Sequence, residues 1–238
     1  MKYFDEYVSN YDMSDTDISY KYHHSYRVMN NMKLLATKIN LSPKDIKLAK
    51  IIGLLHDIGR FEQDKLYNSF KDDKMDHADY GVKVLKDNNI LDKFNIPSKD
   101  YEVVYKAIRN HNKFTIEPNL TEREELFSKL IRDADKLDIL YAMGDKQIKR
   151  IKQDNTEISP NLEKDFFNNK KGNKDDIISL NDGLVLTFCY IYDINFKETF
   201  NIIYKEKYYD KIYEAINRKD IFKPYLIHTN KYIEERID

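Results

Sequence analysis

The sequence predicts an all-α protein. The 238 residues include only six Gly and five Pro, so the regular turn punctuation of a β protein is missing. Apolar residues recur three and four positions apart along most of the chain, which is the spacing of one helix face. Hydrophobic residues make up 41% of the chain, enough apolar side chain to build a folded core. We expect one domain over residues 1–238.

Capping chemistry marks where several of these helices begin. In the segment Ser42-Pro43-Lys44-Asp45 the serine caps, the proline takes the first helical position and the aspartate closes the capping box. This helix is expected to run to about Ile58 and to stop at Gly59. Further capping patterns predict helix starts at Asp76, at Ser98 after Pro97, and at Thr121.

The last third of the chain predicts more helices with few reactive groups. The polar segment of residues 168–176 predicts an exposed loop. After Gly183 the apolar spacing continues through Phe188, Tyr192 and Phe196 to Phe200, and further helical stretches are expected around residues 208–217 and 224–237. We expect this part to complete the helical core.

Composition excludes several classes of protein. Forty Lys and Arg residues against 41 Asp and Glu residues give a net charge of -1, so no overall basic excess points to bulk binding of nucleic acid. Cys189 is the single cysteine, which rules out an internal disulfide and fits a reducing compartment. The longest apolar stretch, Leu184 to Tyr192, is too short to span a bilayer. We therefore expect a cytoplasmic protein without a membrane partner.

Histidines beside acidic residues carry the chemical signal. His56 and Asp57 end a helix that is apolar on almost every face from Ile46 to Ile58. A buried carboxylate needs a cation or a metal ion, because desolvation alone would neutralise it. The alternative is a buried His-Asp hydrogen bond, which is common in protein cores.

Three other segments place polar groups on apolar faces. His24 shares a helix face with Val28 and Leu35, and His111 extends an apolar stripe that contains Ile108. His77 follows the capping Asp76, and Gly81 one turn later permits close approach of another helix or a ligand. The segment of residues 131–138 carries three acids and two bases inside an otherwise apolar helix.

His24, the pair His56-Asp57, and an Asp in the segment Asp133-Ala134-Asp135-Lys136-Leu137 occur in this order, and this pattern resembles the HD-domain metal-dependent phosphohydrolase superfamily. The resemblance covers about residues 18–143 and implies an HD-domain helical bundle, with a C-terminal helical extension at about residues 160–238. It implies a first metal ion held by His24, His56, Asp57 and Asp135. It also implies a second ion on His77 and His111, with Asp57 bridging. A helical wheel alone does not choose between Asp135 and Asp133, and His24 over His23 rests on the family pattern as well.

The resemblance implies an enzyme that hydrolyses a phosphoester of a nucleotide or another small phosphorylated metabolite. One or two divalent ions (Mn, Fe, Mg, Ni or Co) would activate water, with Asp57 as a catalytic residue. Arg60 stands where ppGpp hydrolases and deoxynucleoside 5′-monophosphate phosphatases carry an acid, so these two activities are less favoured for this chain. We expect Arg60 to contact phosphate or, alternatively, to form a salt bridge. Two other hypotheses are a non-catalytic, metal-containing sensor or partner-binding module, and a nuclease that acts on single-stranded nucleic acid.

Overall fold

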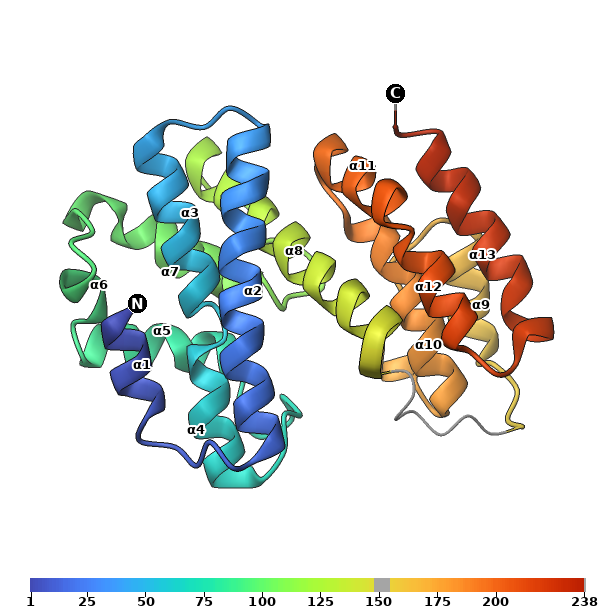
Figure 1. Cartoon of the computed structure of the whole chain (residues 1–238), viewed down its shortest axis with the longest axis horizontal. Coiled ribbons are helices and arrows are strands. Elements are labelled where there is room, and N and C mark those ends of the chain that lie inside the picture. Colours follow the sequence, from blue (N-terminus) through green and yellow to red (C-terminus); the bar gives the residue numbers. More distant parts are fainter. Residues whose placement is uncertain (148–154, 238) are drawn as a thin grey trace. The chain divides into compact units, whose positions relative to one another are not determined.

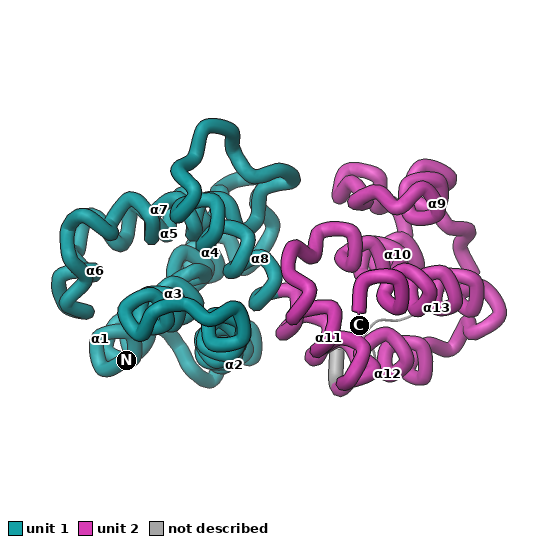
Figure 2. Tube along the Cα trace, turned by 90° about the horizontal axis from the view of Figure 1, so that it is seen from above, with its two compact units in different colours: residues 1–135 teal, residues 136–238 magenta. Residues whose placement is uncertain are grey.

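The computed structural model describes residues 1–147 and 155–237. The described residues form helices and turns without a β-strand, so the all-α prediction is confirmed (Figure 1). The chain divides into two compact units, residues 1–135 and 136–238 (Figure 2). The expectation of one domain over residues 1–238 stays a prediction. None of the described helices is long and apolar enough to cross a membrane.

The first unit is a helical bundle built around α2 and α3, which pack side by side (Figure 1). α4 packs on α5, and α7 packs on both α3 and α5. Side chains such as Val28, Leu35, Ile52 and Phe61 are fully buried between them. The elements of this unit are α1 (Lys2–Val8), α2 (Thr16–Lys38), α3 (Pro43–Leu55), α4 (Ile58–Tyr67), α5 (His77–Asp87), α6 (Ile90–Lys93), the turn η1 (Ser98–Asp100), α7 (Tyr101–Asn110) and most of α8 (Glu122–Ala142).

Three of the predicted helix starts are confirmed. The Ser42 hydroxyl accepts the Asp45 backbone N–H, with Pro43 at the first helical position of α3. The Asp76 carboxylate caps α5 by accepting the N–H groups of the second and third helical residues. At α8 the Glu124 carboxylate accepts both the backbone N–H and the hydroxyl of Thr121. Local capping chemistry therefore fixes where these helices begin.

Two predicted boundaries need qualification. A helical segment does begin at Ser98, but as the 3-10 turn η1, which leads directly into α7 at Tyr101. α3 ends at Leu55, and Gly59 is not a stop but lies in the first turn of α4. A Cβ at Gly59 would lie 2.2 Å from the His77 carbonyl oxygen and 2.8 Å from the Gly81 nitrogen. Position 59 therefore requires a glycine, because the backbones of two helices meet there. This contact is the close approach of another helix that the sequence predicted at Gly81.

The second unit has a separate, aromatic-rich core. The Phe166 and Tyr225 rings lie 4.7 Å apart between centroids, and Phe188 is fully buried beside them. α10 packs on α9 and α13, and α12 packs on α11 and α13. The elements of this unit are the end of α8, η2 (Met143–Gln147), α9 (Pro160–Phe167), η4 (Lys174–Asp176), α10 (Leu180–Cys189), η5 (Tyr190–Asp193), α11 (Lys197–Glu206), α12 (Tyr208–Ala215) and α13 (Lys219–Glu234).

The second unit confirms the loop prediction and corrects one helix. Residues 168–176 form a largely exposed connection between α9 and α10. The expected continuous helix from Phe188 to Phe200 is wrong, because α10 ends at Cys189 and α11 begins only at Lys197. Asp193 lies in the intervening turn, where its carboxylate pairs with Lys136 and Lys171 at 2.5 Å each. The apolar spacing continues through this connection, where Ile191 is fully buried and Phe196 is partly buried.

Candidate metal centre

The six residues predicted as metal ligands come together in the first unit, although they lie on different elements. α2 supplies His24, the break between α3 and α4 supplies His56 and Asp57, and α8 supplies Asp135. His77 is the first residue of α5, and His111 directly follows α7. All are buried except Asp135, whose side chain is 16% exposed.

The break between α3 and α4 aims two adjacent side chains into the same space. His56 keeps a helical conformation after Leu55, but Asp57 departs from it, with φ −104° and ψ 16°. The new helix then packs on α5 through the close contact of Gly59 with Gly81. This contact brings the start of α5, and with it His77, next to Asp57.

The two carboxylate oxygens of Asp57 face two different pairs of histidines. Oδ1 lies 3.2 Å from His77 Nε2 and 3.5 Å from His111 Nε2. Oδ2 lies 3.5 Å from His24 Nε2 and 3.6 Å from His56 Nε2. One carboxylate therefore divides the cluster into two halves.

Asp135 completes one of these halves. Its Oδ1 atom lies 3.1 Å from His24 Nε2 and 3.7 Å from His56 Nε2. Asp133 is fully buried on the same helix, and His23 is exposed, whereas His24 is buried. The structure thus places Asp135 and His24 in the cluster, the choice that the family resemblance implied over Asp133 and His23.

Hydrogen bonds fix the ring protons of three histidines. His56 Nδ1 lies 2.8 Å from the Gly53 carbonyl oxygen, and His111 Nδ1 lies 2.6 Å from that of Ile108. A carbonyl oxygen only accepts, so both Nδ1 atoms carry the proton. His77 Nδ1 donates likewise to Asp72 Oδ1 at 2.7 Å. The Nε2 atoms of the three rings face the cluster and are the atoms available to a metal ion.

This arrangement fits divalent ions. His77 Nε2 and His111 Nε2 lie 3.0 Å apart, so their lone pairs repel unless a cation or proton lies between them. Nitrogen and oxygen ligands about 2.1 Å from one ion are about 3.0 to 3.4 Å apart, similar to the separations in this cluster. Two sets of three side chains have ligand atoms near enough to share an ion: His24, His56 and Asp135, and His56, Asp57 and His111.

Electrostatics favours ionised Asp57 and Asp135 and a neutral His111. Burial opposes ionisation of Asp57 and Asp135, but Lys21 and His56 beside Asp57, and His24 and His56 beside Asp135, hold the pKa of each carboxyl well below its usual value. Burial lowers the pKa of His111 to about 4. Ionised carboxylates and neutral imidazoles are the forms that bind metal ions.

Comparison with known families agrees with this geometry. The family model of the HD domain matches residues 22–140, half of the chain. The chain belongs to the HD domain family. This family consists mostly of metal-dependent hydrolases. Neither curated proteins nor solved structures gave a match.

Asp72 supports the HD domain's His77 and was not found by sequence reasoning. Its Oδ1 atom accepts from His77 Nδ1, from Arg60 Nη1 at 3.0 Å and from Gln63 Nε2 at 3.0 Å. Gln63 is fully buried and also donates to the Met75 carbonyl oxygen at 2.7 Å. No spacing or capping signal marked Asp72, because the segment of residues 68–76 has no regular structure.

Arg60 takes part in the same support. Nη1 donates to the Phe70 carbonyl oxygen and to Gln63 Oε1, both at 2.6 Å, besides Asp72. Its Nε atom is buried without a hydrogen-bond partner and lies 3.8 Å from Asp57 Oδ1. The salt-bridge alternative for Arg60 is present, and a phosphate contact stays a prediction.

Sequence reasoning also missed two basic residues of the first unit as parts of the centre. Lys21 Nζ donates to Asp57 Oδ2 at 2.7 Å, and it lies one helical turn before His24, which is the only sequence signal for it. Arg132 is buried on α8 and donates to the carbonyl oxygens of Asn110 and Lys113 at 2.6 Å each. Arg132 thus holds the turn that carries His111.

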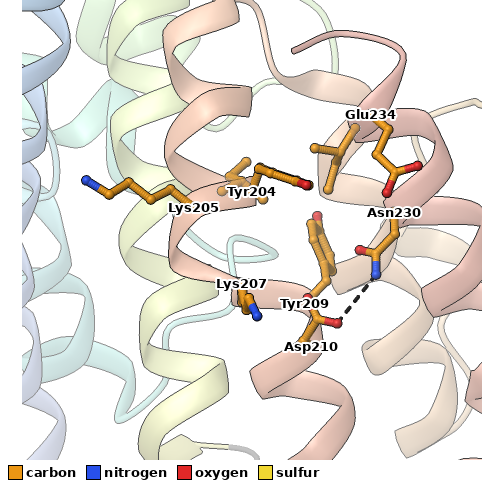
Figure 3. Close-up of a pocket in the computed structure, with 9 residues that line it drawn as sticks. Tyr204, Lys205, Lys207, Tyr209, Asp210, Asn230 and Glu234 are labelled. Atoms are coloured by element: carbon orange, nitrogen blue, oxygen red, sulfur yellow. Dashed lines mark hydrogen bonds between the residues drawn. The ribbon is translucent and has the colours of Figure 1, made fainter. Parts of the chain in front are cut away.

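A pocket lies in the second unit. Its volume is about 280 Å³, and it contains residues from α11, α12 and α13 (Figure 3). Asn230 Nδ2 donates to Asp210 Oδ1 at 3.4 Å, while Lys205 points away from the other labelled side chains (Figure 3). The lining includes lysines and carboxylates but no histidine. The lining of this pocket therefore does not indicate a particular ligand or reaction, in contrast to the histidine and aspartate cluster of the metal centre.

Proposed function

We propose that this HD-domain protein is a metal-dependent phosphohydrolase acting on a phosphoester of a nucleotide or another small phosphorylated metabolite. The observation that carries the proposal is the division of the cluster by Asp57, whose two oxygens face two pairs of histidines. A carboxylate in this position is suited to bridge two ions. Two-metal sites are common among enzymes that displace phosphoryl groups.

The chain's residues divide between the two ions in this proposal. His24, His56, Asp135 and Asp57 Oδ2 would hold one ion, and His77, His111 and Asp57 Oδ1 would hold the other. The mixed imidazole and carboxylate donors suit borderline ions such as Mn, Fe, Co or Ni, and Mg with fewer nitrogen ligands. Bound ions would supply an activated water and offset the charge of phosphoryl oxygens.

The remaining residues act by positioning. Asp72 and the carbonyl oxygens of Gly53 and Ile108 hold the Nδ1 protons, so that His56, His77 and His111 keep their Nε2 atoms aimed inward. Arg60 would place its guanidinium between Asp72 and the substrate phosphate. No side-chain nucleophile is needed.

The test is turnover on a substrate panel. The purified protein is incubated with Mn²⁺ and phosphomonoesters, dinucleotides, cyclic nucleotides and short oligonucleotides, beside Asp57→Asn and the control Asp87→Asn, whose carboxylate is exposed. We expect one preferred small substrate, with turnover lower by on the order of 100-fold or more in Asp57→Asn and unchanged in the control.

Other results would favour the rival hypotheses. Turnover confined to oligonucleotides and weakened by salt would indicate a nuclease. Metal binding without turnover on any compound would contradict the proposal and favour a sensor or partner-binding module. Wild-type metal content together with wild-type turnover in Asp57→Asn would show that the site is assigned wrongly.

A further inference from the structure

Lys21 lies inside the cluster rather than at its edge. Its Nζ atom is 2.7 Å from Asp57 Oδ2, the oxygen that also faces His24 and His56. The Asp57 side chain is 3% exposed, so its charge needs a cation nearby. The ammonium of Lys21, which donates a hydrogen bond to Oδ2, is such a cation.

The same oxygen is needed by the proposed metal ion. An ion bound by Oδ2, His24 and His56 would lie within a few ångströms of the present ammonium position. Two cations at this separation repel strongly where water is excluded. The ammonium and the ion are therefore alternative partners of Oδ2.

Lys21 has somewhere else to go. Its side chain is 15% exposed, whereas His24 and His56 are almost fully buried, so the lysine lies on the solvent side of the cluster. The Phe70 ring lies 5.4 Å from Nζ in its present position, so a cation–π contact that involves none of the metal ligands already accompanies the pair with Asp57 and can be kept when Nζ leaves Oδ2. A flexible four-carbon stem allows the move without a backbone change.

We propose that Lys21 is a tethered cation that occupies Asp57 Oδ2 until a divalent ion displaces it, and that it thereby weakens metal binding at this centre. The inference rests on the metal centre of the proposed function but not on any substrate. A residue that only stabilised the fold would not oppose the metal. Removing the charge of Lys21 then has two effects: Mn²⁺ binds more tightly, and the metal-free protein becomes less stable.

The experiment measures Mn²⁺ binding by calorimetry and Mn²⁺-induced thermal stabilisation. Lys21→Met keeps a similar apolar stem without the charge, and Lys21→Arg keeps the charge. Lys83→Met is the matched control, because Lys83 pairs with exposed Asp87 on the surface of α5. We expect Lys21→Met to bind Mn²⁺ about tenfold more tightly than wild type and to gain more in melting temperature on Mn²⁺ addition. Lys21→Arg should bind more weakly than Lys21→Met, and Lys83→Met should match wild type.

Unchanged or weaker Mn²⁺ binding by Lys21→Met would overturn the inference, as would a lack of binding by every variant. If Lys21→Met is unfolded without metal, recovery of a cooperative melting transition on Mn²⁺ addition supports the inference, and no recovery contradicts it. None of these readouts uses turnover. Tighter binding in Lys21→Met with no turnover on any phosphoester would uphold the inference while the proposed function failed.

Discussion

The contact between α4 and α5 predicts a large effect of one methyl group. In Gly59→Ala the new Cβ would lie 2.2 Å from the His77 carbonyl oxygen, whereas ordinary contacts begin at 3.4 Å. The two helix backbones must therefore separate by about 1.2 Å, the difference between these distances. The neighbour is backbone, so no side chain can rotate to relieve the contact.

The cost follows from this geometry. Overpacking that shifts a backbone costs about 3 kcal/mol, and the helical gain of Ala over Gly returns about 0.5 to 1 kcal/mol, which leaves a net loss of about 2 kcal/mol. Because the displaced carbonyl belongs to His77, its Nε2 atom also moves away from Asp57. Misplacing one ligand in this way should weaken Mn²⁺ binding by about 10- to 100-fold.

Urea unfolding and Mn²⁺ titration measure the two effects. Gly183→Ala on α10 is the matched control, because a Cβ there meets nothing within 4 Å. The control should gain about 0.5 to 1 kcal/mol from helix propensity and bind Mn²⁺ as wild type does. A Gly59→Ala protein as stable as wild type, with wild-type Mn²⁺ affinity, would refute the argument that this contact positions His77.

Three further predictions concern the supports of the histidines. Asp72→Asn should weaken Mn²⁺ binding by about 10- to 100-fold, because the orienting acceptor of His77 loses its charge; an unchanged calorimetric affinity would contradict this. Arg132→Met should lower the free energy of unfolding by about 2 to 3 kcal/mol, since the carbonyl groups after α7 lose a charged donor, and an unshifted urea midpoint would count against it. The metal-free protein should lose up to about 3 kcal/mol of stability as the pH falls from 6.5 to 4, because the unfolded chain protonates His111 in that range while its folded pKa is about 4. His111→Asn should flatten this dependence, and an identical pH profile would rule out His111 as its source.

Features fixed by neighbouring residues were readable from the sequence. Ser42, Asp76 and Thr121 cap helices through bonds to residues two or three positions away. The spacing that led to His111 is likewise a property of one helix face. The all-α architecture followed from such local signals repeated along the chain.

Features that depend on contact between distant segments were not readable. Lys21 meets Asp57 across 36 positions, and no spacing rule links them. Glycine locally favours a helix stop at position 59, but the close backbone of α5 requires Gly59 inside α4. Asp135 and Asp133 flank the same apolar stripe, and only the position of α2 beside α8 distinguishes them.

The fixed Nδ1 protons of His56, His77 and His111 have a calorimetric consequence. The Nδ1 bonds hold the three rings in place, so their Nε2 atoms already point to the place where an ion binds. An ion that arrives therefore freezes little side-chain motion. The measured entropy of binding should include only a small cost for ordering these side chains. The protein meets the entropic cost of ordering these three ligands when it folds, before any ion arrives.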